Sequence, residues 1–314
     1  MYAYALGGLV LLFAGGEWLV RGAVTVSRRF GLSPLLIGMT VVAWCTSAPE
    51  LVVSMGAAFE GQSDIAIGNI VGSNIFNILG VLGAASLIAP IIVKPAELRR
   101  DIGVMLASAV ALAAVAQLGE VGRIAGVVFT LAVAAYVFLS YRSELKNPSL
   151  PSAELHTHEG EEIQTSSSVW PGVGMLAIGL GSLVVGARLL IVGSTAIARG
   201  FGISEAVIGL TLVAVGTSLP ELATSVVAAI RKHSDVAVGN VVGSNIFNIL
   251  GILGITSTVR PIGVAQQIAN LDVWVMLGIS IALAPILLLR GKIGRLLGAA
   301  MLVAYVAYLA VLFQ

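Results

Sequence analysis

Long apolar runs separated by short polar segments dominate the pattern of hydrophobic and polar positions. Each run has about the 20 residues that an α-helix needs to cross the hydrocarbon core of a bilayer. This pattern predicts an all-α integral membrane protein with ten transmembrane helices. The runs fall at residues 3–27, 34–58, 66–89, 102–118, 122–141, 170–198, 205–230, 237–258, 271–289 and 294–313.

A hydrophilic stretch divides these runs into two sets of five. It is rich in proline, serine and glutamate, a composition that buries too little apolar surface to order itself. We expect a first five-helix repeat over residues 1–141, a linker over residues 142–168 and a second five-helix repeat over residues 169–314. Because five is odd, two copies of such a unit cross the membrane in opposite senses, which predicts two inverted-topology repeats.

A polar motif interrupts the apolar pattern once in each half. Its first copy reads TSAPE at residues 46–50 and GSNIFN at residues 72–77. Its second copy reads TSLPE at residues 217–221 and GSNIFN at residues 243–248. Each residue of the second copy stands 171 positions after its counterpart, so no insertion separates the two parts of the motif. An ionisable residue within a membrane span indicates function by default, and two at matching positions strengthen that interpretation.

The proline of the first copy predicts a broken helix. Pro49 has no amide proton and clashes with the preceding turn, so the carbonyls from about Ala43 to Thr46 lose their helical partners. Open backbone at membrane depth is tolerated only where it lines a cavity or is buried in protein. Together with the hydroxyls of Thr46 and Ser47 and the carboxylate of Glu50, these carbonyls form an all-oxygen cluster. Oxygen ligands suit hard cations such as Ca²⁺ and Na⁺.

The second half is expected to supply the same oxygens from the opposite side. A pseudo-two-fold axis in the membrane plane would bring the two glutamates together near the midplane. Two carboxylates neutralise one divalent ion, or hold smaller numbers of monovalent ions or protons. The counterparts in the second half are Ala214, Thr217, Ser218 and Glu221.

The helices that follow the motif prolines add further polar groups. A serine and an asparagine lie four residues apart in each copy and therefore share one helix face: Ser73 with Asn77, and Ser244 with Asn248. Other polar positions are interpreted as structural. They are Asn74 and Asn245 (off that face), Asn69 and Asn240 (helix caps or interhelix bonds), the Gly68/Gly72 and Gly239/Gly243 pairs (close packing), and Glu17 (an ion pair with Arg21).

Composition agrees with a membrane protein and excludes several other classes. The chain has 314 residues, is 58% hydrophobic and 11% charged, and has a mean hydropathy of +1.01, whereas soluble domains carry about 25% charged residues. A net charge of +1 without a basic arm argues against nucleic-acid binding. The single cysteine, Cys45, excludes an intrachain disulfide and the usual zinc patterns. The spans contain no nucleophile–base set, which disfavours an enzyme.

Loop charges predict the orientation in the cell membrane. With the N-terminus outside, most basic loop residues fall on one side, and by the positive-inside rule that side is cytoplasmic. Both termini are therefore expected outside and the 142–168 linker in the cytoplasm. The cytoplasmic set is Arg28, Arg29, Lys94, Arg99, Arg100, Arg142, Lys146, Arg231, Lys232, Arg290, Lys292 and Arg295, against Arg123, Arg199, Arg260, Glu60 and Asp64 on the other side.

The doubled motif, Thr-Ser-x-Pro-Glu followed by Gly-Ser-x-x-x-Asn, resembles the calcium/cation antiporter superfamily, specifically its sodium/calcium exchanger branch. The resemblance covers both repeats and implies ten helices in two inverted repeats. It also implies alternating-access exchange of Ca²⁺ for Na⁺, with the transported ions as ligands and no resident cofactor. The central diamond of sites that it implies falls on Glu50, Asn77, Glu221 and Asn248.

The resemblance also implies how the ions are divided among these residues. Ca²⁺ would be held by the two glutamates together with the backbone oxygens of Thr46 and Thr217. Flanking Na⁺ sites would use Ala43, Ser47 and Ser73 on one side, and Ala214, Ser218 and Ser244 on the other.

The coupling ion is left open by these patterns. Both copies follow the sodium form of the motif, not the Gly-Asn-x-x-Glu form of the proton-coupled branch, which favours Na⁺. An H⁺/Ca²⁺ antiporter with the same carboxylates as proton carriers is the first alternative, and a passive cation channel is the second. Two departures from the family pattern are Asn248, where some relatives have Asp, and Trp44-Cys45, where a small residue and glycine are usual. The oligomeric state is not indicated.

Overall fold

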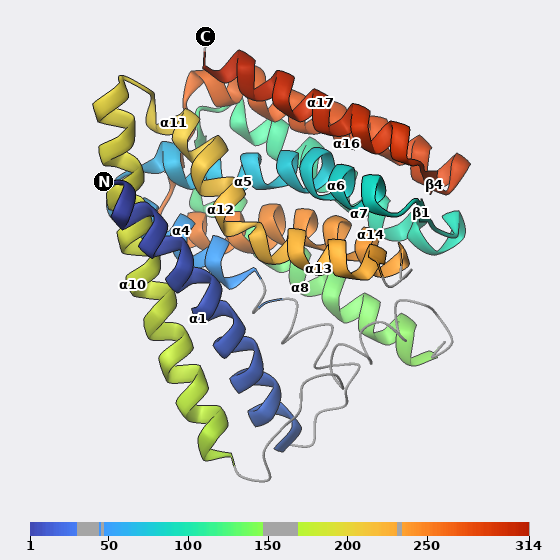
Figure 1. The fold of residues 1–314 in the computed structure, drawn as a ribbon, viewed down its shortest axis with the longest axis horizontal. Coiled ribbons are helices and arrows are strands. Elements are labelled where there is room, and N and C mark those ends of the chain that lie inside the picture. Colours follow the sequence, from blue (N-terminus) through green and yellow to red (C-terminus); the bar gives the residue numbers. More distant parts are fainter. Residues whose placement is uncertain (30–43, 45–46, 147–168, 231–233, 314) are drawn as a thin grey trace.

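The computed structural model describes residues 1–29, 44, 47–146, 169–230 and 234–313, and these residues form a bundle of α-helices (Figure 1). Regular α-helix is interrupted by short π-helical segments. The α-helices are α1 (Tyr2–Arg29), α4 (Ala48–Phe59), α5 (Ser63–Phe76), α6 (Leu82–Ile88), α7 (Pro95–Ala116), α8 (Arg123–Lys146), α10 (Trp170–Phe201), α11 (Glu205–Ile208), α12 (Ala214–Thr217), α13 (Leu219–Ile230), α14 (Ser234–Ile246), α15 (Gly254–Val259), α16 (Val273–Pro285) and α17 (Arg295–Leu312). The π-helical segments are η2 (Asn77–Val81), η3 (Gly209–Val213), η4 (Phe247–Leu253), η5 (Ile268–Asp272) and η6 (Ile286–Arg290).

The helices confirm a multi-pass membrane protein. Seven helices within the described ranges are long and apolar enough to cross a membrane. An eighth candidate is the pair Glu205–Thr217 and Leu219–Ile230, which is bent by 45° at Ser218. Of the ten predicted spans, the second (residues 34–58) is described in its latter part, where α4 lies, while residues 34–43 and 45–46 lie outside the described residues. The fourth corresponds to α7, whose second turn carries the consecutive charges of residues 99–101.

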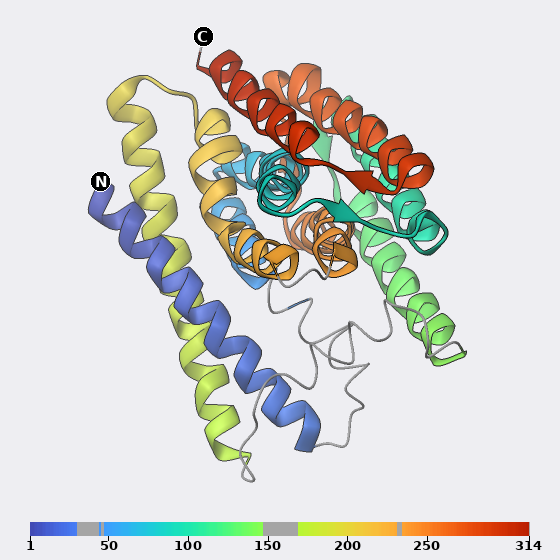
Figure 2. The ribbon, with the colours of Figure 1, turned by 45° about the vertical axis from the view of Figure 1, so that its right-hand side comes forward.

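Two spans lie at the centre of the bundle. The most apolar stretch of Ser63–Ile88 is buried throughout, and that of Ala237–Val259 is largely buried, while in the other five single-helix spans less than half of the corresponding stretch is buried. Figure 2 shows these two spans, in cyan and orange, nearly end-on and surrounded by the other helices. Since lipid tails solvate apolar side chains, the outer helices can expose leucine and isoleucine without cost. The central spans instead lie where polar groups can be enclosed by protein.

Contacts between the two halves recur with the halves exchanged. The two-residue strand β1 (Ile91–Ile92) pairs antiparallel with β4 (Lys292–Ile293), and β2 (Glu120–Val121) pairs antiparallel with β3 (Ile262–Gly263). In the same way, α8 of the first half packs against α15 of the second, and α17 of the second half packs against α6 of the first. Each half therefore covers a central span of the other, which ties the halves into one body.

A hydrogen bond also recurs between the last two spans of each half. The Tyr136 hydroxyl on α8 donates to Asp101 on α7 at 3.1 Å, and the Tyr308 hydroxyl on α17 donates to Asp272 on η5 at 2.8 Å. Asp272 stands 171 positions after Asp101, so the two carboxylates are counterparts in the repeat. The outer helices of the two halves, whose sequences diverge, thus share one tyrosine–aspartate hydrogen bond.

Helices α1 and α10 form an antiparallel pair along one side of the bundle (Figure 1). Glycines spaced seven residues apart face each other across the pair. A Cβ atom built on Gly15 would lie 2.9 Å from the Gly179 carbonyl oxygen, and one on Gly179 would lie 2.7 Å from the Leu19 amide nitrogen. Small residues let membrane helices approach this closely, and the backbones themselves are in contact. The facing glycines are Gly8 with Gly186, Gly15 with Gly179, and Gly22 with Gly172.

Candidate ion-binding site

Both halves break their helix at the motif proline. In the first half, Ser47 (φ −87°, ψ 7°) precedes α4, which has Pro49 in its first turn. In the second half, Ser218 (φ −89°, ψ 12°) separates α12 from α13. Proline is favoured in the first turn because its missing N–H is unneeded there. The breaks place Glu50 and Glu221 in the first turns of α4 and α13, where the helix dipole favours a negative charge.

The two breaks meet in the structure. The Ser218 hydroxyl of the second half donates to Glu50 Oε1 of the first half at 3.2 Å. The Ser73 hydroxyl of the first half donates to the Ala214 carbonyl of the second half at 3.4 Å. Glu50 and Glu221 are both almost completely buried, with 1% and 2% of their surfaces exposed. The motif residues of the two halves therefore share one polar interior.

Four of these buried residues carry an oxygen that accepts no hydrogen bond from the described residues. They are Glu50 and Glu221, each through Oε2, and Asn77 and Asn248, each through Oδ1. Folded proteins pair the large majority of their buried polar atoms, and an unpaired one costs about 1–3 kcal/mol. Of the ten unpaired buried side-chain atoms found in the described residues, these four belong to the four residues of the predicted diamond. Carboxylate and amide oxygens in this state are suited to a hard cation.

The two buried carboxylates of this interior have no basic partner among the described residues, an arrangement suited to a bound cation. No ion pair among the described residues includes Glu50 or Glu221; the described pairs join Arg21 to Glu17, Arg100 to Asp101 and Arg199 to Glu205. Two ionised carboxylates in a low-dielectric interior repel each other strongly. A divalent cation, or monovalent cations or protons, would remove that repulsion.

The two asparagines of the diamond lie in π-helical segments. η2 begins at Asn77, and η4 includes Asn248. π-bulges are rare and occur mostly at functional sites, because they redirect the backbone of an otherwise regular helix. Trp44 supports the second of these segments: its ring meets Phe247 edge-on, with a distance of 5.3 Å between ring centroids. The unusual tryptophan thus packs beside the residue that precedes Asn248.

Asn69 and Asn240 form interhelix bonds, which is one of the two structural roles, helix cap or interhelix bond, that the sequence left open. The Asn69 amide donates to the Glu50 carbonyl at 3.4 Å and to the Ser54 hydroxyl at 2.9 Å. The Asn240 amide donates to the corresponding Glu221 carbonyl at 3.3 Å and Ser225 hydroxyl at 3.0 Å. Asn69 also accepts a 3.0 Å hydrogen bond from the Thr217 hydroxyl of the other half. Each asparagine therefore holds the backbone of one glutamate in place.

We predict that Asn69→Leu lowers the melting temperature of the detergent-solubilised protein more than Asn240→Leu does. The first change leaves the Ser54 and Thr217 hydroxyls and the Glu50 carbonyl without this partner in a buried position, at about 1–3 kcal/mol for each unpaired group. Asn240 lies at a half-buried position, where water can replace part of what is lost. Thermal unfolding in ion-free buffer measures the difference. Equal losses in the two variants would contradict a larger role for Asn69.

The remaining predicted ligands are placed as follows. Ser47 and Thr217 are buried beside the breaks, and Ser244 is buried in α14. Ser73 and Ala214, which were assigned to different flanking sites, contact each other directly. Ala43 and Thr46 lie outside the described residues.

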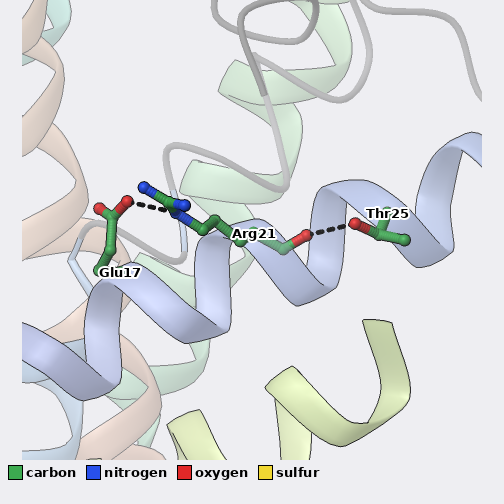
Figure 3. Close-up of polar contacts among 3 residues, drawn as sticks. All are labelled: Glu17, Arg21 and Thr25. Carbon is green, nitrogen blue, oxygen red and sulfur yellow. Dashed lines mark hydrogen bonds and ion pairs between the residues drawn. The ribbon is translucent and has the colours of Figure 1, made fainter. Parts of the chain in front are cut away.

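Glu17 lies apart from this interior. Its carboxylate accepts a 2.6 Å hydrogen bond from Arg21 one turn later on α1, and about half of each side chain is exposed. Figure 3 shows this pair, together with the Thr25 hydroxyl that donates to the Arg21 carbonyl at 2.8 Å. The predicted ion pair is therefore confirmed.

One contact with the diamond comes from a residue that was interpreted as structural. The Asn77 amide nitrogen donates to the Asn245 side-chain oxygen of the other half at 3.1 Å. Helical spacing places Asn245 one position away from the serine–asparagine face, so spacing within one helix conceals the contact. The occurrence of an asparagine at this position in both copies is the signal that could have revealed it.

Comparison with known proteins gives a consistent result over the whole chain. The family model described as "Sodium/calcium exchanger protein" matches residues 1–142 and 171–314. Sodium/calcium exchanger MaX1 of Methanosarcina acetivorans is 34% identical, covering 98% of this chain and 96% of that protein. Putative antiporter CaxA of Alkalimonas amylolytica is 37% identical, covering 99% and 98%. Inner membrane protein YrbG of Escherichia coli is 34% identical, covering 99% and 96%.

Solved structures of the sodium-calcium exchanger NCX_Mj are similar in fold. One, from a crystal soaked with 100 mM Na⁺ and 10 mM Sr²⁺, has a TM-score of 0.64 and 36% identity, covering 98% of this chain and 97% of that one. Another, soaked with zero Na⁺ and Ca²⁺, has a TM-score of 0.62 and 35% identity, covering 99% and 98%. The comparison of sequences and the comparison of folds therefore both indicate sodium/calcium exchangers as relatives.

Proposed function

Because the chain belongs to the sodium/calcium exchanger family of membrane cation antiporters, we propose that it exchanges Ca²⁺ for Na⁺ by alternating access. It is a transporter rather than an enzyme or a passive channel. The observation that carries the proposal is the set of four buried, unpaired oxygens that both halves contribute to one interior. NCX_Mj, a relative of similar fold, is described as a sodium-calcium exchanger and was soaked with Na⁺ and Sr²⁺.

The proposed architecture is ten transmembrane helices in two inverted repeats. The paired contacts that recur with the halves exchanged are what a pseudo-two-fold axis in the membrane plane produces. The repeats would span residues 1–141 and 169–314, joined by the 142–168 linker. Basic loop residues support a cell-membrane protein with both termini outside and the linker in the cytoplasm.

In the proposed site, Ca²⁺ is held between Glu50 and Glu221. Backbone oxygens of Thr46 and Thr217 complete its ligands. Asn77 and Asn248 stand at the other two corners of the diamond, each with an oxygen that has no donor among the described residues. Na⁺ would occupy flanking positions formed by Ala43, Ser47, Ser73, Ala214, Ser218 and Ser244.

Exchange follows from the competition of the two ions for overlapping oxygens. Either Ca²⁺ or Na⁺ neutralises the two carboxylates and allows the loaded site to pass through an occluded state. Moving two unpaired charges through a low-dielectric interior is costly, so the empty site should cross rarely. The closely packed α1–α10 pair would slide as one unit against the core that carries the site, opening it to one side at a time.

The coupling ion can be determined by a flux experiment. Proteoliposomes containing the purified protein are loaded with radioactive Ca²⁺ and diluted into media that combine the presence or absence of external Na⁺ with the presence or absence of a pH step. We expect rapid Ca²⁺ efflux whenever Na⁺ is present, with little effect of the pH step alone. Choline replaces Na⁺ in the matched control, which keeps ionic strength constant.

Two other outcomes would contradict the proposal. Efflux driven only by the pH step would show that the carboxylates carry protons instead, which is H⁺/Ca²⁺ exchange through the same site. Efflux that needs neither gradient and does not saturate with Ca²⁺ would show a passive pathway. Empty liposomes and the Glu50→Gln variant define the background.

A further inference from the structure

The side chain of Asn245 has only one orientation that satisfies its neighbours. Its amide nitrogen donates to the Asn74 backbone carbonyl of the other half at 3.4 Å. A backbone carbonyl only accepts hydrogen bonds, so the NH₂ group of Asn245 must face it. The side-chain oxygen of Asn245 is then directed to Asn77.

This orientation determines the orientation of Asn77. Facing an acceptor oxygen at 3.1 Å, the Asn77 amide must present its NH₂ group, and it does. Its own oxygen is thereby directed away from Asn245, and that oxygen is buried with no hydrogen-bond partner in the part of the chain that the structure describes. If the Asn77 amide turned over, an N–H donor would face a bound cation in place of an acceptor. Asn77 is useful as a ligand in only one of its two orientations.

We infer that Asn245 is a positioning residue, which holds the Asn77 amide with its oxygen toward the transported ion. This inference rests on the proposed function, because it assigns a role toward the same site. The relay has three members from two halves: the Asn74 carbonyl orients Asn245, Asn245 orients Asn77, and Asn77 contacts the ion. Asn245 itself does not contact the ion.

The repeat counterpart of Asn245 does not make the mirrored contact. The Asn74 amide donates to the Ile70 carbonyl of its own helix at 2.8 Å, and the side-chain oxygen of Asn74 has no partner among the described residues. Asn74 is therefore a matched control. It has the same residue type and the same place in the motif, yet its side chain orients no residue of the diamond.

The test compares Asn245→Leu with Asn74→Leu, both of which remove the amide at similar side-chain volume. Asn245→Leu should raise the KM for Ca²⁺ in proteoliposomes about tenfold, the effect of losing one buried hydrogen-bonded orientation, while the maximal rate changes less. Asn74→Leu leaves the backbone carbonyl in place and should change the KM less than about twofold. An unchanged KM in Asn245→Leu, or an equal rise in both variants, would overturn the inference.

Repeating the Asn245→Leu change in an Asn77→Asp variant shows whether Asn245 acts by orienting the Asn77 amide or only by packing between helices. In Asn77→Asp, both side-chain oxygens are acceptors, so orientation no longer matters. Adding Asn245→Leu to Asn77→Asp should then leave Ca²⁺ affinity unchanged or improve it. The same tenfold loss in both backgrounds would show that Asn245 acts through helix packing, and the positioning role would be wrong.

Ca²⁺ binding to the purified protein keeps the comparison independent of transport. The rise in melting temperature on adding Ca²⁺ reports affinity even in a variant that does not transport. Failure of the proposed function would show as wild-type protein without Na⁺-driven Ca²⁺ flux. Failure of the positioning role alone would show as normal wild-type exchange and binding together with an unaffected Asn245→Leu variant.

Discussion

Glu50→Gln and Glu221→Gln are each expected to abolish Na⁺-driven Ca²⁺ efflux, with a fall in the initial rate of about a hundredfold or more. Glutamine keeps the shape of the side chain but removes one of the two negative charges that would neutralise Ca²⁺ in the proposed site. In a buried site the remaining single charge leaves the ion partly uncompensated, and its desolvation is no longer offset. The measurement is the initial efflux rate of radioactive Ca²⁺ from proteoliposomes with matched protein content.

Glu17→Gln is the control for these two variants. Glu17 also belongs to a membrane helix and also loses one charge, but its side chain is half-exposed and paired with Arg21 outside the central interior. It should retain most of the wild-type rate, since exposed ion pairs contribute about 0–1 kcal/mol. Near-normal flux in Glu50→Gln or Glu221→Gln, or an equal loss in Glu17→Gln, would contradict the assignment of the site.

Gly179→Leu is expected to have the second largest effect, because it acts on the backbone contact between α1 and α10. A Cβ at this position would lie 2.7 Å from the Leu19 amide nitrogen and 2.9 Å from the Gly15 carbonyl oxygen, so the helices must separate. Overpacking costs about 1–3 kcal/mol where side chains can adjust, and here the obstacle is backbone. We expect a lower melting temperature and a transport rate reduced at least about tenfold.

Gly181→Leu provides the matched control for this change. Gly181 lies two residues further along the same helix, is exposed, and has no described atom within 4 Å of a Cβ built on it. The added leucine would face lipid and should leave stability and flux near the wild-type values. If both variants behaved alike, the close approach of α1 and α10 would not be important for the protein.

The central carboxylates show how far local chemistry can be read from a sequence. Pro49 and Glu50 stand in an apolar run, and the same pair recurs at residues 220–221. Because burial of a charge and loss of helical hydrogen bonds are both costly in lipid, their repetition predicted one shared site. The cross-half contact between Ser218 and Glu50 shows that the two breaks meet, while the binding of ions by the individual ligands remains a proposal.

The α1–α10 contact has a counterpart in the spacing of glycines along the sequence. Close packing was expected at the Gly68/Gly72 and Gly239/Gly243 pairs, whereas the seven-residue spacing of Gly8, Gly15 and Gly22 marks one face of another helix. A seven-residue period keeps such a face turned toward a partner. Which partner it meets cannot be deduced from α1 alone, since several other helices also carry glycine.

What the sequence by itself determined is the class of protein, the position of the helix breaks and the set of oxygen-bearing residues. These follow from local rules: the length of a span, the missing amide of proline and the cost of a charge in lipid act along one chain segment. Tertiary structure alone decided which of those groups are paired with one another. Asn69 and Asn245 are both used in contacts with the other half, whereas one oxygen on each of Glu50, Glu221, Asn77 and Asn248 has no hydrogen-bond partner among the described residues. The physical reason is that hydrogen bonds between residues 148 and 168 positions apart depend on how the halves pack, and no periodicity within a single helix specifies that packing.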